Sequence, residues 1–261
     1  MSKDDELLEA MCKESQVDFK IAKELKARIF PLLGNAHKGN IHSFDRAFLE
    51  QKKGIDTRLE NSGIIMTLLA KMRPNDFSIQ QRKALSLHLE FLTLFEGFFA
   101  TQINFLIFAL IANGCKFYSS QKRKNIEFLN DIEGEPLKTR IKFLRQHGFK
   151  TLITGKIGIE LRNSVAHLFY EIEDDGTVKI GRRRISENTY AKLYDNLRDI
   201  SKSLHFITVL FYQRYAFMPT TEFEEIKCAC GYVNLIPKNR TVLGPEPLTC
   251  TKCKKYLAEP K

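Results

Sequence analysis

Apolar residues recur every three or four positions along most of this chain, which is the spacing of one buried face of an α-helix. The longest such pattern begins after Ser186, a candidate helix cap, and ends before Pro219. Its apolar positions are Tyr190, Leu193, Leu197, Ile200, Leu204, Ile207 and Phe211. This spacing predicts a long helix with a continuous apolar seam, suited to packing in a bundle or against a partner helix.

The first 75 residues predict two helices. The first spans roughly residues 4–30, and the Pro, Gly and Asn within residues 31–40 are expected to end it. The second begins at Ser43 and ends near Pro74. The sequence leaves open whether these helices form a separate helical hairpin or join the bundle formed by the rest of the chain.

The most apolar stretch is Phe98–Gly114, which reads FFATQINFLIFALIANG. It completes a helix that we expect to begin at a cap on Ser78 and to end at the Asn-Gly pair. Gln102 and Asn104 interrupt the stretch, so its uninterrupted apolar part is shorter than the ~18 residues that favour a membrane span. We therefore predict a buried helix and no membrane partner.

Shorter elements follow this helix. We predict helices over residues 120–129 and 137–146, the second ended by Gly148, and another over residues 157–168. Apolar and polar residues then alternate on both sides of Asp175-Gly176, in EIEDDGTVKI, which predicts a small β-hairpin.

The composition agrees with a mainly α globular fold. The chain has 261 residues, of which 43% are apolar and 20 are Phe, enough for a substantial hydrophobic core. We expect an N-terminal helical region in residues 1–75, a helical-bundle domain in residues 76–218 and a cysteine-containing segment in residues 222–261. The N-terminus carries no apolar stretch of the secretory kind, so we expect a cytoplasmic protein.

The net charge is +10 and the pI is about 9.3. Between Lys116 and Lys150 there are nine basic and four acidic residues. Such a balance favours polyanionic partners, either nucleic acid or an anionic lipid surface, although many globular proteins are simply basic. The sequence GRRRIS at residues 181–186 is either a further basic contact or a solvated turn.

The six cysteines fall into two groups. Cys12 and Cys115 stand alone in helical stretches and are expected to be small buried hydrophobes. The other four form two short pairs near the C-terminus: Cys228, Cys230, Cys250 and Cys253. Four thiolates at this spacing fit a tetrahedral structural zinc site, and the segment looks like a zinc ribbon. One residue separates the first pair where a ribbon usually has two, and a redox-active pair or an unstructured tail are the alternatives.

The stretch LRNSVAHLFY, residues 161–170, places polar side chains in an otherwise apolar helix. Arg162 has a guanidinium suited to phosphate oxygens and is unlikely to be buried without a partner. Asn163 lies four residues before His167 and therefore on the same helical face. A lone histidine in an apolar helix is more often structural than catalytic. Arg162 and His167 are also about 140° apart around an ideal helix, so one straight helix does not aim both at one atom.

The sequence RNSVAH at residues 162–167 resembles the RN-x-x-x-H form of the R-x4-6-H motif of HEPN domains. The similarity covers about residues 78–217 and includes the all-helical surroundings and the long final helix. The resemblance implies a homodimeric, metal-independent endoribonuclease, with possible roles in defence or as a toxin with an antitoxin partner. By that analogy His167 activates an RNA 2′-hydroxyl, Arg162 binds the scissile phosphate and Asn163 positions His167, leaving 2′,3′-cyclic phosphate ends.

Two other classes of function stay open. HEPN domains also serve as non-catalytic dimeric scaffolds or nucleotide-binding modules, in which Arg162 and His167 would hold a ligand or an interface. A zinc-dependent DNA-binding regulator is the third reading, for which the basic segments suffice. We find no phosphate-binding loop of the nucleotide-hydrolase kind, no nucleophile elbow and no acidic metal cluster in the sequence.

Overall fold

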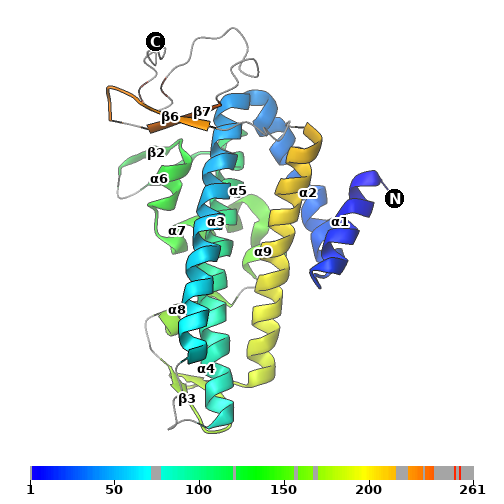
Figure 1. Ribbon diagram of the computed structural model, residues 1–261, viewed down its shortest axis with the longest axis vertical. Helices are drawn as coiled ribbons and strands as arrows, with labels where there is room; N and C mark the ends of the chain where they lie inside the picture. Colours follow the sequence, from blue (N-terminus) through cyan, green and yellow to red (C-terminus); the bar gives the residue numbers. More distant parts are fainter. Residues whose placement is uncertain are drawn as a thin grey trace.

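The computed structural model describes residues 2–71, 78–119, 122–155, 158–166, 170–215, 223–231, 233–237, 250 and 253. These residues form a mainly helical structure with small antiparallel sheets. The helices α3 (Ile41–Lys71), α4 (Ile79–Leu92) and α9 (Glu187–Tyr215) extend along the long axis of the molecule (Figure 1). The expectation of a mainly α protein is therefore confirmed.

The prediction of one helix over residues 4–30 is wrong in two respects: the helix is interrupted near residue 16, and it continues past Pro31. The chain forms α1 (Lys3–Glu14), turns at Gln16 with φ of 55°, and continues as α2 (Phe19–Gly39). Asp18 caps α2 by accepting a hydrogen bond from the Lys20 amide at 2.8 Å. Pro31 lies inside α2 on its exposed side. The residues Ile29, Leu33 and Ala36 are buried on the opposite side, and this burial holds the helix together past the proline.

The prediction of a cap at Ser78 is confirmed. The Ser78 hydroxyl accepts a hydrogen bond from the Gln81 amide at 3.0 Å, and the Gln81 side chain accepts one from the Ser78 amide at 2.9 Å. The helix runs through α4, the π-helical segment η1 (Thr93–Phe99) and α5 (Ala100–Ala112). It ends at Gly114, whose φ of 88° suits a glycine.

This run from Ile79 to Ala112 is the one helix in the described part of the chain with the length and composition of a membrane span, and 72% of its most apolar window is buried inside the protein. Every residue from Ala100 to Leu110 is buried. The run has the environment of a core helix, as the interruptions at Gln102 and Asn104 suggested.

The predicted helix over residues 120–129 is wrong. The strands β1 (Phe117–Ser119) and β2 (Lys124–Ile126) pair instead as an antiparallel hairpin, with Phe117 opposite Ile126 and both buried. The short helices α6 (Leu129–Glu133) and α7 (Leu137–Leu144) follow, and α7 leads into the π-helical segment η2 (Arg145–Thr154). Gly148, with φ of 83°, kinks this segment where the sequence predicted a helix end.

The motif-bearing helix α8 (Ile159–Ala166) is followed by a three-stranded antiparallel sheet. Strands β3 (Glu171–Ile172) and β4 (Val178–Ile180) form the predicted hairpin. Strand β5 (Arg183–Ile185) adds a third strand that was not predicted. Ser186 then caps α9, with its hydroxyl accepting from the Thr189 amide at 3.4 Å.

One hydrophobic core joins the N-terminal helices to the rest of the bundle. The same buried cluster contains residues of α2, α3, α5 and α9, among them Leu33, Phe44, Phe105 and Phe211. Helix α1 joins this bundle through a smaller buried cluster, in which Leu8 and Cys12 lie with Phe206 and Leu210 of α9. Helices α1 to α3 therefore belong to the same bundle, which is the second of the two arrangements that the sequence left open. Beyond α9, strands β6 (Phe223–Lys227) and β7 (Val233–Pro237) pair antiparallel at one end of the molecule (Figure 1).

Candidate functional site

Helix α8 separates its apolar and polar side chains by helical periodicity. Leu161 and Val165 are each 2% exposed and join the core, whereas Arg162 is half-buried and Asn163 is exposed. The apolar spacing of four residues fixes which side of the helix packs inward. Arg162 and Asn163 therefore lie on the accessible side of α8, as a ligand-binding role requires.

Arg162 contacts two side chains. Its Nε and Nη2 both form an ion pair with Oε1 of Glu96, and its Nη1 donates a hydrogen bond to Oδ1 of Asn163 at 2.9 Å. The Arg162 side chain is 19% exposed and that of Glu96 is 43% exposed. The guanidinium is thus neutralised by a carboxylate that stays accessible to solvent.

Glu96 lies in η1, a π-helical turn within the long helix. Its neighbours Phe95 and Phe99 are fully buried, and the Ala100 amide donates to the Phe95 carbonyl five residues earlier. The extra residue of a π-turn shifts the register of the helix faces, and such turns are frequent at functional sites. Glu96 was not predicted as a site residue, although a carboxylate beside the most apolar stretch was a visible signal.

The two acidic residues nearest to the motif in sequence have other partners. Glu160 pairs with Arg183 at 2.8 Å, and Glu171 pairs with Lys179 at 2.9 Å. Arg184 of β5 is ion-paired with Glu173. Two arginines of the GRRRIS segment are therefore ion-paired with acidic residues of α8 and of the loop after β3, and all three of its arginines are exposed.

The structure brings together two of the three predicted catalytic residues, Arg162 and Asn163. His167 lies outside the described residues, so its role as a base stays a prediction. The described chain resumes at Tyr170, whose ring lies 4.5 Å from that of His88 of α4, measured between centroids.

His88 forms a buried polar cluster with Tyr170 and Tyr190. His88 is 1% exposed, and its ring lies 4.8 Å from that of Tyr190 of α9. Among the described residues, the Tyr190 hydroxyl and both ring nitrogens of His88 lack a hydrogen bond of good geometry, and the Ala84 backbone offers the His88 ring only a weak polar contact. Burial lowers the pKa of His88 to about 4 and raises the pKa values of Tyr170 and Tyr190. His88 is therefore neutral at physiological pH.

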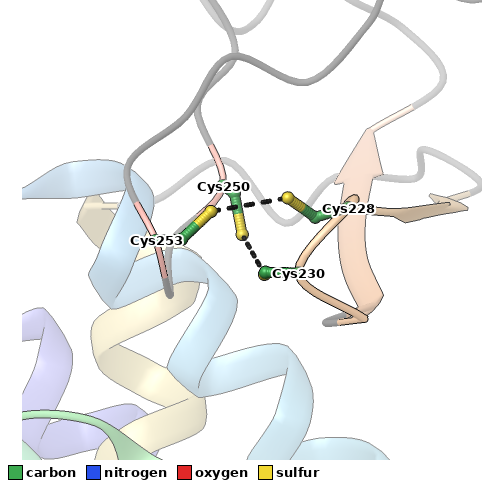
Figure 2. A group of neighbouring side chains, drawn as sticks. All are labelled: Cys228, Cys230, Cys250 and Cys253. Atoms are coloured by element: carbon green, nitrogen blue, oxygen red, sulfur yellow. Dashed lines mark hydrogen bonds between the residues drawn. The ribbon is translucent and has the colours of Figure 1, made fainter.

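The four C-terminal cysteines converge on one point (Figure 2). Cys228 and Cys230 lie in the turn after β6, which Gly231 completes with φ of 81° and an amide hydrogen bond to the Cys228 carbonyl at 2.8 Å. Their sulfurs face Cys253 at 3.5 Å and Cys250 at 3.7 Å, respectively. The single residue between the first two cysteines does not prevent convergence, because the turn directs both thiols to the same side.

The geometry of this group fits a metal ion. All four sulfurs lie within 4.8 Å of one another, and none is in a disulfide. A tetrahedral zinc ion with Zn–S bonds of about 2.3 Å separates its sulfurs by about 3.8 Å, close to the Cys228–Cys253 and Cys230–Cys250 distances. Cys228 and Cys250 are buried, so a bound ion would be largely shielded from solvent. The group is compatible with a structural metal site.

Comparisons with known proteins identify no relative: no protein family, curated protein or solved structure matches this chain.

Proposed function

We propose that the protein is a metal-independent endoribonuclease of the HEPN type that acts as a homodimer. The observation that carries the proposal is the position of Arg162 and Asn163, which lie in contact with each other on the accessible side of α8. The net charge of +10 supports a polyanionic substrate. The RNSVAH motif supplies the remaining residue, His167.

The proposed reaction is a transesterification within the RNA strand. His167 removes the proton of a 2′-hydroxyl, whose oxygen attacks the adjacent phosphorus. The bond from phosphorus to the 5′-oxygen breaks, and this oxygen leaves with the bonding electrons and takes up a proton. The products are a 2′,3′-cyclic phosphate and a 5′-hydroxyl. DNA lacks the 2′-hydroxyl and is not cleaved.

Arg162 stabilises the charge that develops on the non-bridging phosphate oxygens. A guanidinium offers several N–H donors in a plane, so it can bind two phosphate oxygens at once. In the free protein Glu96 takes this place, and Asn163 holds one nitrogen of the fork. The phosphate displaces Glu96, whereas the hydrogen bond to Asn163 keeps Arg162 oriented.

We further propose that the four cysteines bind a structural zinc ion and form a zinc ribbon. A segment of this size has little core, so the metal would supply much of its folding free energy. All four ligand positions are thiolates, which leaves no open position for a catalytic water. The zinc thus has no part in the proposed cleavage.

The decisive experiment incubates the purified protein with a mixture of single-stranded and structured RNAs and maps the product ends. We expect cyclic phosphate ends that persist with a mild chelator and disappear in Arg162→Ala and His167→Ala. The matched control is Arg183→Ala, which removes another arginine that is ion-paired with a glutamate, Glu160. Cleavage that is unchanged in both motif variants, or absent in folded dimeric protein, contradicts the proposal.

A non-catalytic HEPN scaffold is the second candidate, and the Arg162–Glu96 ion pair favours it. The ion pair with Glu96 joins α8 to η1, and this structural role is enough to account for an arginine at position 162. This candidate predicts that Arg162→Ala lowers the thermal stability of the protein and that the wild-type protein yields no RNA products. A zinc-dependent DNA-binding regulator would instead bind duplex DNA equally well with and without His167.

A further inference from the structure

The β1–β2 hairpin presents an exposed aromatic ring among exposed cations. Tyr118 is 58% exposed, the most exposed aromatic side chain in the described part of the chain. It lies opposite Asn125 in the strand register. The cations Lys116, Arg123 and Lys124 are also exposed. No described carboxylate forms an ion pair with any of these three cations, in contrast to Lys122, which pairs with Asp131 at 2.7 Å.

The hairpin is held rigidly from its other side. Phe117 and Ile126 are buried in the core, and the Phe117 ring lies 4.7 Å from that of Phe143 of α7. The buried Ser119 hydroxyl donates to Glu135 at 2.5 Å and accepts from the Lys122 amide at 3.0 Å. These contacts anchor the hairpin to the core, so Tyr118 occupies a preformed position and loses little entropy when a partner binds.

Arg123 adds an independent observation. It has φ of 50°, a left-handed conformation in which glycine or asparagine is the favoured residue. An arginine here has a conformational cost of about 1 kcal/mol relative to glycine. A functional use of the positive charge would explain why arginine occupies a position that its backbone conformation disfavours.

We propose that this hairpin binds single-stranded RNA, stacking an unpaired base on Tyr118 while Lys116 and Arg123 contact the flanking phosphates. Exposed aromatic rings beside cations bind single strands in this way, because every base has a face for stacking and every nucleotide carries a negative charge. A duplex keeps its bases stacked inside and has none to offer Tyr118. That the ligand is RNA rests on the proposed function. The hairpin adds that the RNA is bound in its unpaired form.

The hairpin is separate from the Arg162 site. Figure 1 places β2 toward the end of the long axis that carries β6 and β7, and α8 nearer the other end. A strand that contacts both Tyr118 and Arg162 must therefore extend along the bundle. Binding at the hairpin is measurable without cleavage.

The test measures the affinity of the full-length protein for a fluorescent 2′-O-methyl oligouridine, which cannot be cleaved by 2′-hydroxyl attack. We expect Tyr118→Ala to raise Kd about five- to 150-fold, the range that stacking of one base contributes. Tyr118→Phe, the matched control, keeps the ring and should keep Kd within about twofold of wild type. The same oligonucleotide paired with its complement should bind with no dependence on Tyr118.

A second variant tests the cations. Arg123→Asn removes the charge but tolerates the left-handed backbone, and it should lower the slope of log Kd against log salt by up to about 0.7. Lys20→Ala on α2, which removes another exposed cation, should leave the slope unchanged.

Three results overturn the inference: no binding of the single strand, equal binding by Tyr118→Ala and wild type, or a salt slope that Arg123→Asn leaves intact. If the nuclease proposal alone is wrong, the result is different. The protein then cuts no RNA, but its binding of the single strand still depends on Tyr118. Cleavage and binding that are both unchanged in the hairpin variants would contradict the inference alone.

Discussion

Arg162 of α8 is ion-paired with Glu96 of the π-helical turn η1, a residue 66 positions earlier in the chain. The ion pair joins α8 to η1, and it engages the guanidinium of the arginine in the RNSVAH motif. The Glu96 side chain is 43% exposed, so the pair lies within reach of solvent. This relationship connects the packing of α8 to any phosphate chemistry at Arg162.

Replacement of Glu96 by glutamine should tighten RNA binding. Glu96→Gln removes the negative charge that competes with phosphate for Arg162 but keeps an oxygen that accepts a hydrogen bond. We expect Kd for an uncleavable oligonucleotide to fall about two- to fivefold, a size typical of accessible ion pairs. The control is Glu160→Gln, which removes an exposed carboxylate from the same helix as Arg162. An unchanged or higher Kd in Glu96→Gln alone would show that Glu96 serves to orient Arg162 or that no phosphate binds there.

Loss of any one of the four clustered cysteines should abolish zinc binding. Cys250 is fully buried, so Cys250→Ser exchanges a thiolate ligand inside the group for a weaker hydroxyl. We expect about one zinc per wild-type chain and much less than one in the variant, measured by elemental analysis of protein purified without added metal. Cys115→Ser, outside the group, should keep the metal. An intact mass lower by two hydrogens for each linked pair would show disulfides instead and contradict the metal site.

His88 should make the protein less stable in mild acid. Its pKa in the folded state is about 4, below the ordinary value of 6.5, so protonation favours the unfolded chain. The stability linked to His88 is therefore complete above pH 6.5 and is lost as the pH falls toward 4. Between pH 7.5 and pH 5 this loss is about 2 kcal/mol. Urea unfolding at both pH values measures it.

The control for this prediction is His88→Leu, which fills a similar volume and does not titrate. We expect the free energy of unfolding of this variant to depend less on pH than that of wild type, by the stated amount. Equal pH dependence in the two proteins would mean that His88 has a polar partner when folded, since a satisfied and solvated histidine keeps its ordinary pKa.

Alanine at position 148 should destabilise the kink in η2. Gly148 has φ of 83°, and a Cβ there would lie 2.1 Å from Nη2 of Arg28. Arg28 would have to leave its hydrogen bond to the His147 carbonyl, which is 3.1 Å long. We expect Gly148→Ala to cost about 1–3 kcal/mol in thermal unfolding. Gly114→Ala has a similar φ but free space around the new methyl group, so it should cost less; equal costs would show that Arg28 moves freely.

Local chemistry made several elements predictable. The cap at Ser78, the stop at Gly114 and the hairpin at Asp175-Gly176 depend on residues within a few positions of one another, so the sequence alone contains the whole signal. The seam of α9 is similarly local, because a helix of this length repeats its buried face many times. The four cysteines were recognisable because the spacing within each pair limits where the thiols can point.

Two of the errors in prediction have tertiary causes. Pro31 was expected to end a helix, but the buried side of α2 keeps the helix intact. Residues 120–129 were expected to be helical, but burial of Phe117 and Ile126 on one face of a hairpin stabilises the strands β1 and β2 instead. Local preference is weak in such segments, and burial of apolar surface decides between the alternatives.

By itself the sequence determined the helical class of this protein, several helix ends, the polar pair on α8 and the cysteine group, because each depends on periodicity or on neighbouring residues. Only the tertiary structure decided that Glu96 neutralises Arg162, that His88 lies fully buried against Tyr170 and Tyr190, and that Tyr118 is exposed on a hairpin anchored in the core. These contacts join segments far apart in the chain, and no local pattern specifies which of them meet.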